Sequence, residues 1–358
     1  MRFLFKTSYE QDIRLVKHSG QTFWYSLLVL FLITAPFWAD DYWLSQMSFI
    51  LIYAVAGLGL MLLCGFTGLA SIGHAAFLGV GAYTAAILAS RGCPFPISLA
   101  AAAAVSAVIG ALVGLPALRV KGIYLAIATL AFGFIVEEVL ARWETVTKGN
   151  AGMSVQAPQF FGADLSSLQA MYLIALAICL LVTLGILNLL RSATGRAFIA
   201  IRDSEISAQS MGIHLARYKT LSFALSAAIV GLAGGLYAHQ LRFIAPDQFA
   251  FHQSLDLLVI VVVGGLGSVH GAFLGALFLV CMPQLIAFGK DWLPPAIGQA
   301  VGLQAVIFGG ILIGFIVFEP SGLYGRWVKV RTWLELFPSY RKGMFRQQKS
   351  YAKSDRLK

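Results

Sequence analysis

Ten apolar stretches, most of about 20 residues and some shorter, are separated by charged residues or by proline and glycine breaks. Across the 358 residues, 59% are hydrophobic and only 12% are charged, with a mean hydropathy of +0.80. A soluble domain carries roughly 25% charged residues. We therefore predict an all-α, polytopic membrane protein of about ten transmembrane helices, some of them short or broken. The predicted spans are approximately 23–39, 44–63, 70–90, 97–117, 123–140, 170–190, 220–240, 254–267, 270–288 and 301–319.

The net charge of +10 is concentrated outside these spans. Basic residues cluster before the first span, after Gly322, and in the loop 191–219, which contains Arg191, Arg196, Arg202, Arg217 and Lys219. This distribution follows the positive-inside rule and predicts that both termini and this loop are cytoplasmic. The basic tail is expected to contact anionic lipid, and nucleic-acid binding is not expected.

An even number of spans agrees with this orientation, because it returns the chain to the side on which it started. The loop 142–167 then falls on the outer side. We predict a cytoplasmic tail at 1–22, a transmembrane domain at 23–320 and a second cytoplasmic tail at 321–358.

Two glycine-rich segments resemble each other: GLASIGHAAFLGVGA at 68–82 and GLGSVHGAFLGALF at 265–278, if one residue is skipped near the histidine. Both are predicted to begin at the cytoplasmic side, as in a parallel repeat. The shared positions are Gly68, Ser71, His74, Phe77 and Gly79 in the first copy and Gly265, Ser268, His270, Phe273 and Gly275 in the second.

These segments allow two interpretations. Discontinuous helices in transporters expose backbone groups to a cavity, so the ten shared residues are candidates for helix breaks that line a translocation path. Alternatively, the glycines allow close helix packing, and each histidine is neutral and hydrogen-bonded to a neighbouring carbonyl.

Signals for catalysis are weak. Ser71 and His74 lie three residues apart, as an intramembrane hydrolase could use, but no G-x-S-x-G elbow accompanies them. H-E-x-x-H and P-loop motifs are also absent from the sequence. We predict no catalytic residue, metal site or bound cofactor in this chain. With Asp256 and Glu319 placed near the membrane edges, the span interiors are almost free of charge, which gives an ion-coupled carrier little support.

The central loop TGRAFIAIRDSEISAQSMGIHLARYK (194–219) is basic and has helical propensity. Asp203 and Ser204 are predicted to cap a helix that carries Glu205, Ala208 and Met211. The loop is either a solvated connection or a coupling helix that docks on a cytoplasmic ATPase.

Taken together, four segments resemble the permease subunits of branched-chain amino acid ABC importers of the LivM type. They are GFTGLASIGHAAFLGVGAYTAA, LRVKGIYLAIATLAFGFIVEEVL, GRAFIAIRDSEISAQSMGIHLARYKTLSFALSAAIVGLAGGLYA and VVGGLGSVHGAFLGAL, and the resemblance extends over about 48–320. It implies a bacterial inner-membrane assembly with a second permease chain, two ATPase subunits that bind ATP and Mg²⁺, and a periplasmic substrate-binding protein. Related permeases import urea and short amides, so the substrate is less specified than the family.

The resemblance also implies a coupling role for Arg202, Asp203, Glu205, Ala208, Met211 and Gly212. Ala208 and Gly212 keep the A-x-x-x-G spacing of the family's coupling segment. Ser207 replaces its first alanine, and Glu205 lies one place early. We expect a translocation path along a subunit interface lined by 65–83 and 262–277. A stand-alone facilitator or ion-coupled carrier is the alternative from another class.

Overall fold

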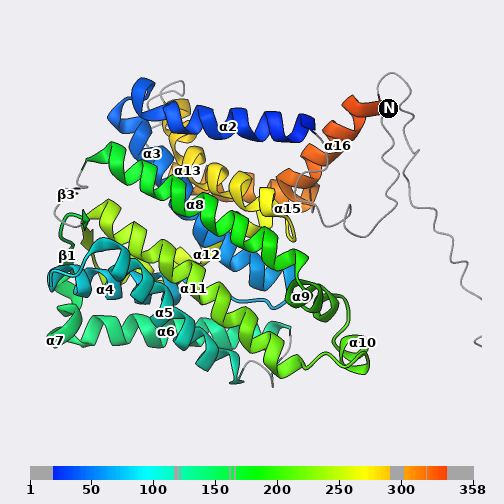
Figure 1. Cartoon of the computed structure of the whole chain (residues 1–358), viewed down its shortest axis with the longest axis horizontal. Coiled ribbons are helices and arrows are strands. Elements are labelled where there is room, and N and C mark those ends of the chain that lie inside the picture. Colours follow the sequence, from blue (N-terminus) through cyan, green and yellow to red (C-terminus); the bar gives the residue numbers. More distant parts are fainter. Residues whose placement is uncertain are drawn as a thin grey trace, which may run out of the picture.

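The computed structural model describes residues 19–116, 120, 122–160, 163–164, 167–290, 302–319 and 321–336. Ten apolar helices in these ranges form a bundle in which most run roughly along one direction (Figure 1). They are α2 (Ser19–Trp38), α3 (Asp41–Leu60), α4 (His74–Ser90), α5 (Phe95–Gly114), α6 (Ile123–Arg142), α8 (Leu168–Arg191), α11 (Leu215–Leu241), α12 (Phe251–Gly264), α13 (Val269–Lys290) and α15 (Leu303–Phe318).

Each predicted span corresponds to one of these helices, which confirms the all-α, polytopic fold class. In the described ranges, seven helical segments are long and apolar enough to cross a membrane. Three further apolar helices are shorter: Thr22–Trp38, His74–Ser90 and Ala305–Phe315. The number ten is therefore approximate.

Short elements collect at the two ends of the bundle (Figure 1). At one end, which we call the strand end, β1 (Met153–Ser154) pairs with β4 (Phe243–Ile244), close to α7 (Glu144–Thr147), η3 (Gly149–Ala151) and η4 (Pro246–Phe249). A second antiparallel pair joins β2 (Gln159–Phe160) to β3 (Ala163–Asp164). The opposite end, which we call the basic end, carries α9 (Ala193–Asp203), α10 (Glu205–Ser210) and α16 (Gly322–Leu336).

Helices α3 and α11 form the centre of the bundle. In the most apolar part of each helix, 78% of the residues are buried in the segment Asp41–Phe66 that contains α3, and 61% are buried in α11. Only 22% are buried in α8. The surface of α8 is therefore available to lipid. A Cβ added to Gly81 of α4 would clash with the carbonyl group of Gly231 on α11, so these small residues allow the two backbones to approach closely.

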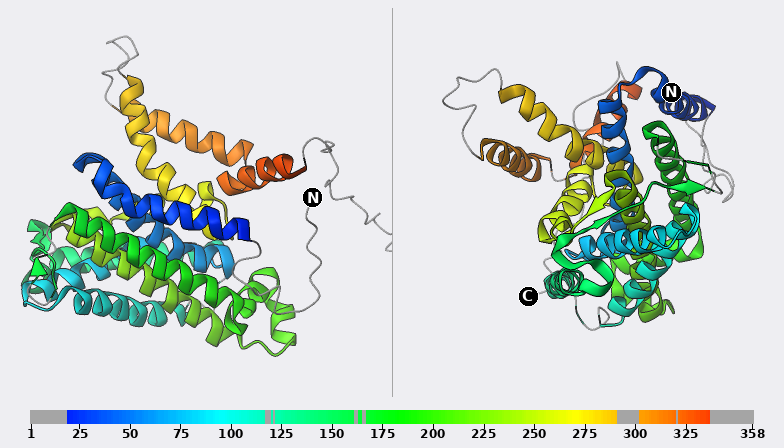
Figure 2. Two further views of the ribbon diagram at one scale, coloured as in Figure 1. Left: turned by 45° about the horizontal axis from the view of Figure 1, so that its top comes forward. Right: turned by 90° about the vertical axis from the view of Figure 1, so that its left-hand side faces the viewer.

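The last helices lie at the edge of the bundle, where α15 and α16 stand apart from the central helices and α13 connects them to α3 and α12 (Figure 2). Glu319, between α15 and α16, accepts hydrogen bonds from Lys329 Nζ at 2.5 Å and Arg326 Nη1 at 2.9 Å. The predicted tail 321–358 thus begins as a helix tied back to the end of α15. Its residues beyond 336, and residues 1–18 of the predicted N-terminal tail, lie outside the described residues.

Candidate functional site

The first glycine-rich segment forms an interruption between two helices. A π-helical turn at Met61–Phe66 continues α3, and residues 67–73 then leave the helix before α4 begins at His74. Gly68 has φ +75°, and a Cβ there would lie 2.9 Å from Arg202 Cγ. The predicted helix break is present, and glycine is required at this turn by both its backbone conformation and the close contact.

Backbone amides in the break and at the start of α4 are paired, two of them with side chains on distant helices. The Ile72 amide donates to Thr129 Oγ1 at 3.0 Å, and the Ala75 amide donates to Ser254 Oγ at 3.1 Å. The Leu69 amide donates to the Leu63 carbonyl oxygen at 3.1 Å. Irregular backbone inside a membrane protein is stable only when such groups are paired, and side chains from α6 and α12 provide that pairing.

His74 is buried at the start of α4 and joins two serines. Its Nδ1 lies 2.8 Å from Ser71 Oγ, and its Nε2 lies 2.9 Å from Ser226 Oγ on α11. Ser226 Oγ donates its only hydrogen to the Gly59 carbonyl oxygen at 2.6 Å, so it must accept from His74 Nε2–H. In the neutral ring, Nδ1 is then the acceptor for the Ser71 hydroxyl. The chain of hydrogen bonds fixes the tautomer and joins the break to α3 and α11.

This arrangement gives no support to a hydrolase. Ser71 is only 1% exposed, and the position where a catalytic triad has its orienting carboxylate is taken by Ser226. Within the described ranges, no three His, Cys, Asp or Glu side chains come together as a metal site requires.

The second glycine-rich segment also breaks a helix, between α12 and α13. Gly265 and Gly267 have φ +116° and +78°, and Ser268 Oγ accepts from the Gly271 amide at 3.0 Å and donates to the Gly265 carbonyl oxygen at 3.0 Å. Unlike His74, His270 is exposed. It bonds through Nε2 to Tyr25 Oη at 2.7 Å and stacks on Tyr324 at a centroid distance of 5.4 Å. The second histidine therefore joins the two terminal helices α2 and α16.

The two breaks meet each other at the basic end. The Gly267 amide donates to Met61 Sδ at 3.2 Å, and Arg202 Nη1 donates to the Gly65 carbonyl oxygen at 3.2 Å. A Cβ added to Gly267 would lie 3.3 Å from Arg202 Nη1. Both copies of the repeat thus begin at the same end of the bundle, as the sequence predicted, and Arg202 joins them to α9.

The remaining repeat positions pack inside the chain. A Cβ on Gly79 would lie 3.0 Å from Phe249 Cγ, and one on Gly275 would clash with the Ile260 carbonyl group. Phe77 is buried between His74 and Phe132, and Phe273 is half-buried against the core. Gly79 and Gly275 therefore pack against helices of the same chain, and a translocation path along a subunit interface lined by 65–83 and 262–277 stays a prediction.

The central loop folds into α9 and α10 with a single residue between them. Ser204 caps α10, since its Oγ accepts from the Ser207 amide at 3.3 Å. Asp203 is not the cap that the sequence suggested, because it ends α9 and pairs with Arg202. Met211 lies just beyond α10 and Gly212 follows with φ +84°, so the glycine ends the helical segment.

Helix α10 has an inner and an outer face. Ala208 is buried, and Glu205 Oε1 accepts from Lys219 Nζ at 2.6 Å, with only 2% of the Lys219 side chain exposed. Ile206 and Met211 are each 80% exposed. The sequence alone indicates only that Lys219 is one of the basic residues of the loop. It does not predict the ion pair, because Lys219 and Glu205 are 14 residues apart.

Similarity to known proteins shows the family to which the chain belongs. Residues 42–316 match the family model for the permease component of branched-chain amino acid transport systems. The chain belongs to this permease family. The LivM permease proteins of the high-affinity branched-chain amino acid transport systems of Salmonella typhimurium and Escherichia coli are each 33% identical to it, over 83% of this chain and 73% of their own length.

A more distant relative is the LsrC permease protein of the autoinducer 2 import system of an Enterobacter strain. It is 27% identical over 66% of this chain and 69% of its own length. The names of the relatives therefore specify different substrates. No solved structure matches the permease. The family and the apolar helices show that this permease is a multi-pass membrane protein.

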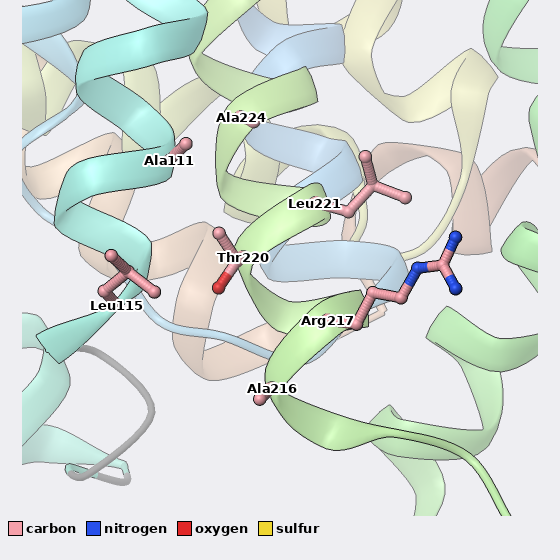
Figure 3. Close-up of a pocket in the computed structure, with 7 residues that line it drawn as sticks. All are labelled: Ala111, Leu115, Ala216, Arg217, Thr220, Leu221 and Ala224. Carbon is pink, nitrogen blue, oxygen red and sulfur yellow. The ribbon is translucent and has the colours of Figure 1, made fainter.

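A groove of about 500 Å³ opens on this permease between the end of α5 and the start of α11 (Figure 3). Alanine and leucine side chains line it together with Thr220 and Arg217. None of the predicted site residues lines this groove, which lies at the basic end rather than along the helix breaks.

One charged residue lies deeper in the permease than the sequence suggested. A span that begins at residue 254 puts Asp256 near a membrane edge. The apolar helical segment runs over Pro246–Gly264, so Asp256 lies near the middle of that segment. By length and composition, the middle of this candidate span therefore carries a carboxyl group.

Proposed function

We propose that this chain is the membrane-spanning subunit of an ATP-driven importer of branched-chain amino acids, with its basic end in the cytoplasm. The observation that carries the proposal is the 33% identity to the LivM permeases over 83% of the chain. In this proposal the partners are a second permease chain, two ATPase subunits that bind ATP and Mg²⁺, and a periplasmic substrate-binding protein.

The arrangement of α10 supports a coupling role for the central loop. Its exposed apolar residues Ile206 and Met211 can enter a groove on an ATPase subunit, while Ala208 and the Glu205–Lys219 pair hold the helix against the permease. Exposed apolar residues with a polar surround are typical of protein contacts.

Arg202 provides a physical connection from this loop to the helix breaks. It lies at the end of α9 and donates to the Gly65 carbonyl oxygen. A movement of α10 driven by ATPase closure would therefore act on the point where the two breaks meet. The remaining coupling residues, Asp203 and Gly212, shape the turns on either side of α10.

The test is transport by the reconstituted assembly, with ATPase subunits, binding protein and radiolabelled leucine. We expect ATP-dependent leucine uptake, and Ile206→Glu should abolish it by preventing ATPase docking. Val330→Glu is the matched control, since Val330 is also exposed at the basic end but lies on α16. Uptake without ATPase subunits would indicate a facilitator, and uptake of urea but not leucine would indicate the amide-importing branch of the family.

A further inference from the structure

Asp256 has no ion-pair partner in the described part of the chain. Among the residues that the structure describes, no hydrogen bond or ion pair reaches its carboxylate. His252, one turn earlier on α12, interacts with it only at longer range. A charged group within a membrane span is costly unless it faces a polar cavity or binds an ion, which makes this carboxylate a candidate to bind a cation from outside the described chain.

Polar and aromatic groups lie on the same side of α12 as this carboxylate. Gln253 and Asp256 are three residues apart on α12, so their side chains lie on one face of the helix. Gln253 Nε2 donates to Tyr53 Oη at 3.3 Å, and the rings of Tyr53 and Tyr237 lie 6.2 Å apart. The four side chains come from α3, α11 and α12, and all of them are partly exposed.

Apolar rings complete the cluster. Tyr237 packs against Phe49 at 6.2 Å and against Phe249 at 6.1 Å between ring centroids. One place thus offers a carboxylate acceptor for an ammonium group, hydroxyl and amide donors for a carboxylate, and ring faces for an aliphatic side chain. Tyrosine faces also attract cations.

We propose that Asp256, Tyr53, Tyr237 and Gln253 form a substrate-contact site within the membrane, where Asp256 binds the ammonium group of a zwitterionic amino acid with an apolar side chain. The site rests on the proposed function, because it assigns the substrate of that function to named residues. Helix α12 carries Asp256 and also Ser254, which pairs with the Ala75 amide beside the first break. Occupation of the site and the geometry of the break therefore depend on the same helix.

Asp256→Asn tests the site in the reconstituted assembly. We expect leucine uptake to fall by about tenfold or more, as loss of a charge-assisted hydrogen bond predicts. ATP hydrolysis stimulated by the loaded binding protein should persist, because docking of neither partner is changed. Asp256→Glu should retain part of the uptake. Asp41→Asn, which removes an exposed carboxylate at the start of α3, should leave uptake unchanged.

Chemical restoration of the charge gives an independent readout. In Asp256→Cys, the negatively charged sulfonatoethyl methanethiosulfonate should restore part of the uptake and the positively charged trimethylammonium reagent should not. The chain without the added cysteine is treated in parallel, because it has cysteines of its own.

Three outcomes would overturn the site. Wild-type uptake by Asp256→Asn would do so, as would equal effects of the two reagents. Loss of the second permease chain from the Asp256→Asn assembly would show that Asp256 forms an ion pair between subunits. If the unmodified assembly imported urea but not leucine, the proposed function itself would fail, and the ammonium assignment would fall with it.

Discussion

Lys219 Nζ lies 2.6 Å from Glu205 Oε1, and the lysine side chain is almost completely buried at the start of α11. The pair joins α10, whose exposed residues are proposed to contact an ATPase, to the longest helix of the bundle core. Glu205 is the residue whose place in the coupling segment departs from the family pattern. In this permease its carboxylate is directed at Lys219 of α11 rather than away from the bundle.

Removal of Lys219 should loosen α10. In Lys219→Met, Glu205 keeps a partly buried charge without this partner, and breaking such a pair costs about 3–5 kcal/mol when both groups are fully buried. Since Glu205 is 22% exposed, we expect the lower end of that range. The measurements are thermal unfolding of the purified permease and coupled uptake by the assembly. The exchanged pair Glu205→Lys with Lys219→Glu should recover part of the loss, and no recovery would show that shape rather than charge matters here.

The glycines of the repeat should differ in their tolerance of a single methyl group. Gly275→Ala should destabilise the permease by about 1–3 kcal/mol, as overpacking typically does, because the new Cβ meets the backbone of Ile260. Gly79→Ala should cost less, since the ring of Phe249 can move. Gly185→Ala is the control, because that glycine on α8 has open space around it. Thermal unfolding of the three variants measures the order, and equal midpoints would contradict the packing described for α12 and α13.

His74 is expected to act through its two hydrogen bonds. His74→Leu leaves the Ser71 hydroxyl without its acceptor and removes the donor to Ser226, a loss of about 1–3 kcal/mol for a buried polar group. His74→Gln should retain more stability, since an amide can donate and accept. Ser71→Ala should be milder than His74→Leu. The midpoints of thermal unfolding measure this order of stability. His270→Leu is the control at the exposed histidine. In a separate experiment, a serine-reactive probe should leave Ser71 unmodified.

The attachment of α16 should depend on pH. Hydrogen bonds from Lys329 and Arg326 lower the pKa of Glu319 below its usual value. A lowered pKa in the folded state means that the attachment is fully present above the ordinary carboxyl pKa of about 4.3 and is lost as the pH falls through the lowered pKa. Hydrogen exchange across 322–336 should therefore be slow at pH 7 and faster in Glu319→Gln at the same pH. Equal exchange in the two proteins would show that α16 does not depend on this carboxylate.

The proposed orientation can be checked by labelling. Ser204→Cys at the basic end and Asn150→Cys at the strand end are both exposed positions. An impermeant maleimide added outside intact spheroplasts should label Asn150→Cys and should reach Ser204→Cys only after lysis. Labelling of both from one side would refute the single crossing by α8 between them and the orientation that follows from it.

Long apolar stretches made the positions of the helices predictable, because each crossing needs its own run of apolar residues. The breaks were predictable from the glycines that interrupt those runs. The partners of the breaks were not, because Thr129, Ser226 and Ser254 are ordinary helix residues whose roles depend on which helices become neighbours. The start of the segment that carries Asp256 was missed for a related reason: η4 adds length to the start of the span, and a boundary drawn at charges and polar residues misses such an extension.

The hydrogen bonds of the first break also constrain the order in which the permease assembles. Residues 67–75 leave the ribosome well before Thr129, Ser226 and Ser254, whose hydroxyl groups hold the break in place. Until those residues are made, the amides of Ile72 and Ala75 must be paired with water or with the insertion machinery. Helix α4 therefore cannot take its final position when it is first inserted. It must wait until nearly three quarters of the chain has been synthesised, which makes the native break a late product of biogenesis rather than an early one.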